Sequence, residues 1–143
     1  MRRRRHLAAV AFAVLLLACT SGRPEGATTP PPTVTAPLPV EQTVDPSATG
    51  RVAAVTWDRA VRIEDDVLDV YYVASASRCR RLANVRVAET ATSVTITVFE
   101  GGDPGDTTVC TGVGVKARVR VPLRAPVGQR TLLDGATDPP RAR

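Results

Sequence analysis

Histidine, lysine and aromatic residues are scarce in this sequence of 143 residues. His6 is the one histidine, Lys116 is the one lysine, and phenylalanine, tryptophan and tyrosine together make up 3% of the chain. No window shows a convincing helical repeat of apolar residues. Few aromatic rings argue against a sugar-binding site, which usually needs aromatic platforms, and core packing is the expected role of most of those present.

Long apolar runs are also absent, except at the N-terminus. Arg2, Arg3, Arg4 and Arg5 precede twelve apolar residues, 7–18. As a helix these twelve residues rise about 18 Å, well short of a hydrocarbon core about 30 Å thick. A basic segment followed by a short apolar one predicts a secretory signal peptide rather than a permanent span. Both the general secretory and the twin-arginine export routes remain open.

The end of this apolar run, Leu16-Leu17-Ala18-Cys19, resembles a bacterial lipobox. The resemblance implies cleavage between Ala18 and Cys19, a diacylglyceryl group on the Cys19 sulfur, and acylation of the new amino group, for example by palmitate. Two or more acyl chains hold a soluble domain at a membrane where one chain would not. The alternative is an ordinary cleaved signal and free secretion. We expect a lipoprotein on the extracytoplasmic face of the cell membrane.

Cleavage changes the charge of the chain. Loss of residues 1–18 takes away four arginines and no acidic residue, so 19 basic residues fall to 15 against 14 acidic ones. A mature protein near neutrality is not expected to bind nucleic acid. His6 is lost as well, which excludes Ser-His-Asp and Cys-His catalysis. We therefore expect no enzymatic activity and no cofactor.

The three cysteines have two expected roles, lipid attachment for one and a disulfide for the other two. With Cys19 lipidated, Cys79 and Cys110 remain as a pair in an oxidising compartment, where a disulfide is expected. A bridge that closes about 30 residues stabilises a fold by roughly 3.5–4 kcal/mol in the chain-entropy model. A zinc or redox site is the alternative, but a third ligand and a Cys-x-x-Cys spacing are both missing.

Composition divides the chain into four segments. Residues 1–18 are the signal peptide, and residues 19–50, which hold seven of the twelve prolines, predict a disordered Pro/Thr-rich tether. Residues 51–134 predict a β domain. Residues 135–143 predict a disordered tail.

Strict alternation of apolar and polar residues marks the strands of the β domain. The pattern is clearest over 113–123 and is repeated over 93–100 and 67–75. Three more strands are expected, over 82–89, 52–57 and 60–64. Short strands at this spacing predict an all-β fold, either a small antiparallel sandwich with Ig-like packing or a partly open barrel.

The segment from Cys79 to Gly135 carries a pattern of residues by which it resembles a group of short secreted proteins and lipoproteins of high-GC actinobacteria. That group has no established activity, so the resemblance implies location and a small Cys-bridged β domain but no reaction. The residues that carry the resemblance are Cys79, Leu82, Glu89, Thr90, Cys110, Leu123, Pro126, Gly128, Arg130, Asp134 and Gly135.

Lys116, Arg118 and Arg120 alternate along one face of the strand at 113–123. This face is a candidate surface for anionic lipid headgroups or wall polymers. The alternative is that the charges protect an edge strand from pairing with another sheet.

Two clusters of acidic residues are candidates for a calcium site, one over 64–69 and one at Asp103 and Asp106. Neither has the ligand spacing of a recognised calcium loop, so we interpret both as solvated turns and expect no metal site.

Glu89 and Arg130 both lie where an apolar strand meets polar sequence, and both belong to the pattern above. We expect a carboxylate–guanidinium pair that fixes the last strand to the sheet. A binding site is the rival interpretation.

These features favour a non-enzymatic β domain that is anchored by lipid and binds another component of the cell envelope, a protein, an anionic lipid or a wall polymer. The alternative is a carrier or binder of a small apolar or anionic lipid ligand. A domain of about 85 residues can hardly enclose an internal cavity, which weakens the carrier alternative.

Overall fold

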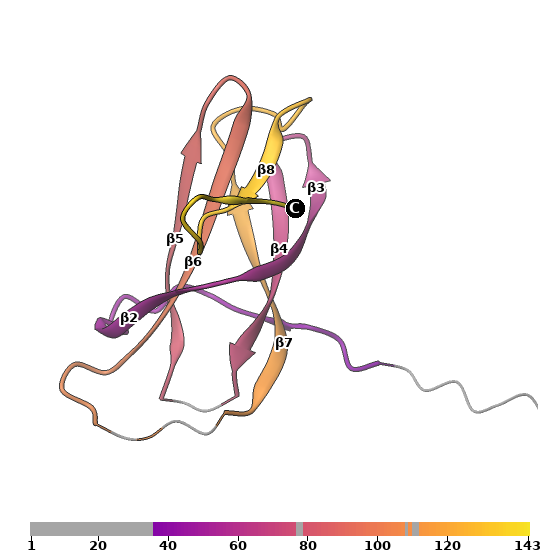
Figure 1. The fold of residues 1–143 in the computed structure, drawn as a ribbon. Coiled ribbons are helices and arrows are strands. Elements are labelled where there is room, and N and C mark those ends of the chain that lie inside the picture. Colours follow the sequence, from indigo (N-terminus) through magenta and orange to yellow (C-terminus); the bar gives the residue numbers. More distant parts are fainter. Residues whose placement is uncertain (1–35, 77–78, 108, 110–111) are drawn as a thin grey trace, which may run out of the picture. The chain divides into compact units, whose positions relative to one another are not determined.

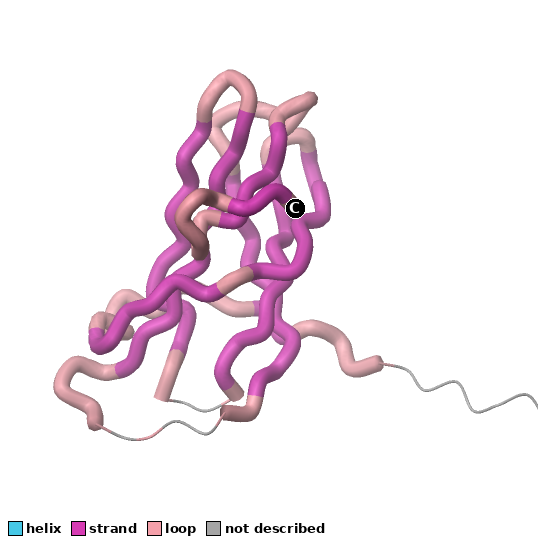
Figure 2. Tube along the Cα trace, in the orientation of Figure 1, coloured by secondary structure: helices cyan, strands magenta, loops and turns pink. Residues whose placement is uncertain are grey.

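The computed structural model describes residues 36–76, 79–107, 109 and 112–143, which belong to one compact unit, 36–143. Nine strands and no helix occur in these residues (Figure 2). The all-β prediction is therefore confirmed. Cys19 and Cys110 lie outside the described residues. The strands are β1 (Val40–Glu41), β2 (Gly50–Val55), β3 (Trp57–Glu64), β4 (Val67–Ser75), β5 (Arg81–Glu89), β6 (Ser93–Gly102), β7 (Gly114–Pro122), β8 (Thr131–Asp134) and β9 (Arg141–Ala142).

The strands form two sheets, neither of which closes into a barrel, as in a small β-sandwich (Figure 1). The first sheet has the order β1-β7-β4-β3. In the second sheet β5 pairs with one edge of β6, while β2 and β8 share its other edge and β9 lies outside β8. The expected antiparallel pattern holds for most pairs, but β1 runs parallel to β7, and β8 runs parallel to β6. Parallel pairs need long connections, and here each connection crosses to the other sheet.

Alternating residues of the long strands fill the space between the sheets. On β6, Val94, Ile96 and Val98 are fully buried, as the alternation predicts. The inward side of β4 and most of that of β7 are buried as well, whereas Val113 precedes β7 and is exposed. The core cluster is Trp57, Leu68, Val70, Tyr72, Ala74, Leu82, Val94, Ile96, Val98, Ala117, Val119, Val121, Leu123 and Val127.

The predicted tether is wrong over its last part, because residues 36–50 belong to the β domain. β1 pairs with β7, and the Asp45 N–H donates to the Leu82 carbonyl at 2.8 Å. Ala48 is buried. Backbone pairing and two ion pairs, Glu41–Arg118 and Asp45–Arg81, fix a segment whose composition alone predicts disorder.

The predicted disordered tail is also wrong, since β9 pairs with β8. The reason is the Asp134 carboxylate, which is fully buried and needs a cation. Arg143 supplies one at 2.6 Å, and its guanidinium also lies 5.6 Å from the centre of the Trp57 ring. The backbone N–H groups of Trp57 and Ala136 donate to the same carboxylate. One buried acid thus joins β3, β8 and the C-terminal segment.

Candidate functional site

The predicted basic face lies on β7, which β1 covers at Ala117 and Arg118. Over 119–122 the outer edge of β7 has no backbone partner among the described residues. Arg118 lies 2.5 Å from Asp69 on β4 and 2.7 Å from Glu41 on β1. The Nε of Arg120 lies 3.0 Å from Asp69. Two of the three cations therefore form cross-strand pairs within the sheet. Lys116 is exposed and has no ion pair with another described residue.

Asp69 is fixed as an ionised structural group. Its side chain is only 2% exposed, and hydrogen bonds from Arg120 and then Arg118 hold its pKa below the ordinary value, against the effect of burial. The interpretation of the 64–69 cluster as a solvated turn is therefore right for the exposed residues of the β3–β4 turn and wrong for Asp69. A carboxylate held in this way is a poor proton donor or acceptor near neutral pH.

The structure brings Glu89 and Arg130 together, as predicted. Arg130 Nη1 lies 2.8 Å from Glu89 Oε2, and both side chains are nearly buried. The backbone N–H of Arg124 donates to Glu89 Oε1, and the pKa of Glu89 is lowered by that bond first and then by Arg130. Arg130 also donates to the carbonyls of Ala125 and Pro126. The pair therefore ties the end of β5 to the turn before β8.

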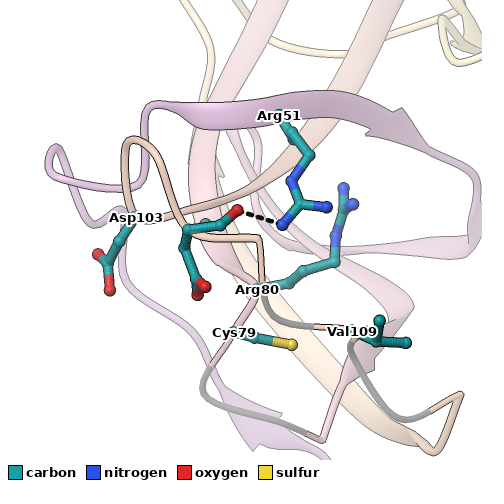
Figure 3. A pocket seen from close by; sticks show the side chains of 7 residues that line it. Arg51, Cys79, Arg80, Asp103 and Val109 are labelled. Carbon is teal, nitrogen blue, oxygen red and sulfur yellow. Dashed lines mark hydrogen bonds between the residues drawn. The ribbon is translucent and has the colours of Figure 1, made fainter.

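A pocket of about 270 Å³ lies where β2, the start of β5 and the turn after β6 meet. Figure 3 shows the side chains of Arg51 and Arg80 extending toward this hollow and that of Asp103 pointing away from them. Arg51 donates to the Asp106 carbonyl, and Arg80 donates to the Glu100 carbonyl at 3.0 Å. We call these seven residues the arginine pocket; they are Arg51, Cys79, Arg80, Gly102, Asp103, Asp106 and Val109.

The backbone at the arginine pocket is unusual. Arg51 has a φ of 46°, a left-handed conformation that costs a non-glycine residue about 1 kcal/mol. A side chain at Gly50 would put its Cβ 2.2 Å from the Asp103 carbonyl oxygen, so glycine is required there. Strained positions of this kind occur at ligand sites as well as at tight crossings.

At the second candidate calcium turn, Asp103 forms an ion pair instead of a metal site. Asp103 lies 2.5 Å from Arg81, which also binds Asp45 at 2.7 Å. No group of three or more potential metal ligands occurs within the described ranges.

A third candidate site lies between β5 and β7, on the open side of the sandwich. A hollow of about 260 Å³ opens there, with Asn84, Arg120 and Pro122 on its rim. Val119 and Val121 are buried, while Val85 and Val87 are half-buried and Val44 is 48% exposed. We call this apolar strip the β5–β7 seam; its residues are Val44, Val85, Val87, Val119 and Val121.

β5 is an unprotected edge strand. The Asp45 N–H covers the Leu82 carbonyl, but among the described residues no backbone group pairs with the outer edge of 84–89. These six residues keep an unbroken register with β6. Figure 1 shows β5 running alongside β6.

The other edges are shorter or irregular. β1 and β9 have two residues each, and β3 has two register shifts and several exposed charges. β2 is interrupted by a register shift between Gly50 and Ala53, and the outer edge of β7 is unpaired over the four residues 119–122 in the part of the chain that the structure describes. Shortening, bulging and charging are the usual means of protecting an edge, and over 84–89 the unpaired charge of Arg86 is the one such feature among the described residues.

Sequence reasoning missed the β5–β7 seam. The alternation over 82–89 shows which residues of β5 face inward, but not that β5 lies at the edge of its sheet. It also missed Asp134 and Arg143 as partners, because their contact depends on the pairing of β9 with β8, and a strand of two residues carries no alternation.

Comparisons with known proteins give no relative: no family model, curated protein or solved structure matches this chain. No helix long and apolar enough to cross a membrane occurs in the part of the chain that the structure describes.

Proposed function

We propose that this chain is a lipoprotein of the extracytoplasmic face of the cell membrane, whose non-enzymatic β domain binds another envelope protein through an extended strand added to β5. The observation that carries the proposal is the free edge of 84–89 beside the apolar β5–β7 seam. Strand addition uses such an edge, since main-chain hydrogen bonds give affinity and alternate side chains enter the neighbouring pockets.

The lipid anchor favours a partner close to the membrane. The lipobox at Cys19 and the start of the compact unit at 36 leave residues 20–35 as the link between them. At no more than about 3.6 Å per residue, this link spans less than about 60 Å. The reach of the domain is therefore confined to the inner part of the envelope.

Site-specific photo-crosslinking in native membranes tests the proposed interface. A photoreactive residue at Ala88, exposed on β5, should give one discrete adduct. The same residue at Val61, exposed on the edge strand β3, is the matched control and should give none. Equal labelling from both positions, or none from Ala88, would contradict the proposal.

The proposed lipid anchor at Cys19 is tested separately from the β5 interface. Cys19→Ala removes the acceptor of the diacylglyceryl group, so the variant should accumulate as uncleaved precursor or leave the membrane. Detergent partitioning and intact mass of both forms measure this. The same mature mass and equal release into the medium for both forms would refute the anchor.

The Cys79–Cys110 disulfide belongs to the same proposal. It is supported by the cysteine count and by the oxidising compartment that export implies. Mass spectrometry of the unreduced, alkylated protein should show one linked peptide pair, and two alkylated thiols would overturn it.

Capture of a small anionic ligand is a second candidate, favoured by the two guanidinium groups in the arginine pocket. Glycerol 3-phosphate is a suitable probe, with glycerol as its uncharged control. Saturable binding of the phosphate alone, lost in Arg80→Ala and kept in Arg141→Ala, would support this candidate. Binding that both variants keep would rule out the arginine pocket as the site that binds the phosphate.

A further inference from the structure

The two faces of β5 differ in what they offer to an added strand. Val85 and Val87 stand opposite the buried Val98 and Ile96 and face the seam. Arg86 stands opposite Thr97 and faces outward. An added strand places alternate side chains on these same two faces. Its inward positions therefore meet valines, and an outward position meets a guanidinium.

Arg86 is the charge at this edge that is not matched by a carboxylate. Its guanidinium lies 5.1 Å from the centre of the Phe99 ring and has no ion pair with another described residue. Glu89 on the same strand is neutralised by Arg130, and Arg120 on the rim of the seam is held by Asp69. The free edge therefore presents one positive charge to a partner.

Self-pairing at this edge places like charges together. An antiparallel pair of β5 strands keeps both sets of valines inward in three registers centred on residues 85, 86 and 87. In the middle register Arg86 stands directly opposite its copy, and in the other two it stands diagonal to it. Both positions lie within interaction distance of long side chains, and like charges there are destabilising.

We infer that the partner of β5 is an extended segment in which apolar side chains alternate with acidic ones, and that Arg86 both recognises this segment and prevents a second copy of the chain from taking the same edge. This inference rests on the proposed strand addition and names the chemistry of the added strand. Charge distinguishes the acidic segment from a second copy of β5, because the valines of the seam accept the apolar side chains of either one.

Two synthetic peptides test the inference with the full lipidated chain in a non-ionic detergent. Both have eight residues and blocked ends, one alternating valine with glutamate and the other alternating valine with lysine. Fluorescence anisotropy should give at least tenfold tighter binding of the glutamate peptide at low salt. Arg86→Gln should remove the preference, and Arg86→Glu should reverse it. Arg62→Glu, the same charge change on the other long edge strand, should leave the preference unchanged.

Sedimentation of the same proteins tests whether Arg86 prevents a second copy of the chain from pairing with β5. The wild type should be monomeric, and Arg86→Ala should show a concentration-dependent dimer. Equal binding of both peptides would overturn the inference and leave strand addition standing, whereas binding of neither peptide would contradict the proposed function itself. A wild-type dimer whose β5 amides are protected from exchange would show that the occupant is a second copy.

Discussion

At the scale of single residues, paired arginines and carboxylates determine how this domain uses its charge. Asp69 binds two arginines of β7, Glu89 binds Arg130, and Asp134 binds Arg143. The pairs of Asp69 and Glu89 join residues more than 40 positions apart, whereas Asp134 and Arg143 are nine positions apart and join β8 to the C-terminal segment. These three carboxylates therefore have architectural roles, whereas Arg86 at the free edge of β5 has no ion pair with another described residue.

Asp69→Asn tests this role for the most buried acid of the first sheet. The variant loses charge-assisted hydrogen bonds to two arginines, so we expect the free energy of unfolding to fall by about 1–3 kcal/mol. Urea unfolding followed by Trp57 fluorescence measures it. Asp66→Asn, an exposed acid of the β3–β4 turn, is the matched control and should change the free energy of unfolding by less than about 0.5 kcal/mol. Equal effects of both substitutions would contradict the assignment.

The lowered pKa values of Asp69 and Glu89 predict loss of stability in acid. Because each folded pKa lies below the unfolded value of about 4, the contribution of each carboxylate is complete above about pH 5. It is lost as the pH falls through the folded pKa. The unfolding free energy of Asp69→Asn should therefore depend less steeply on pH below 4 than that of the wild type. Parallel curves for the two proteins would be inconsistent with a lowered pKa at Asp69.

The Glu89–Arg130 pair is best tested by a double-mutant cycle on thermal stability. Glu89→Ala and Arg130→Ala should each lower the melting temperature, and together they should lower it by clearly less than the sum, because either one removes the same contact. The control cycle pairs Glu89→Ala with Arg124→Ala, since Arg124 contributes its backbone N–H and keeps it as alanine. Additive effects in the first cycle would mean that the pair does not couple.

At the scale of strands, alternation predicted the long elements and their inward faces, but not which strand lies beside which. β1 and β9 were not predicted, because two residues carry no alternation. The parallel pairing of β8 with β6 depends on a connection through the other sheet, and period-two patterns are the same in parallel and antiparallel pairs. Alternation also does not show whether the strand at 113–123 lies at an edge, which was the alternative interpretation of its basic face, and β1 covers that strand at Ala117 and Arg118 only. The Glu89–Arg130 contact was predictable because both residues lie where an apolar strand meets polar sequence and both belong to the pattern that runs from Cys79 to Gly135.

The C-terminal segment gives a prediction at this scale. Arg143→Ala leaves the buried Asp134 carboxylate without its cation, so the variant should be less stable by about 1–3 kcal/mol and should show altered Trp57 fluorescence, since Arg143 also lies against that ring. Arg141→Ala removes an exposed arginine of β9 and is the matched control. A stability of Arg143→Ala equal to that of the control would show that the tail does not contribute to the fold.

At the scale of the whole molecule, the described residues form a small β-sandwich with a hollow between β5 and β7. We propose that a lipid anchor at Cys19 keeps the domain near the membrane and that the domain holds another envelope protein through the free edge of β5. The arginine pocket lies elsewhere, at the junction of β2 with the turn after β6, so the two candidate sites can be tested separately.

Hydrogen exchange of the β5 amides in native membranes distinguishes an occupied β5 edge from a free one. Residues 84–89 form an exposed edge, so half of their amides should exchange rapidly in the purified protein. In membranes that hold the partner, the same amides should exchange at least tenfold more slowly, while the edge of β3 should exchange equally in both preparations. Protection of β3 and β5 alike, or identical exchange of 84–89 in the two preparations, would contradict strand addition at β5.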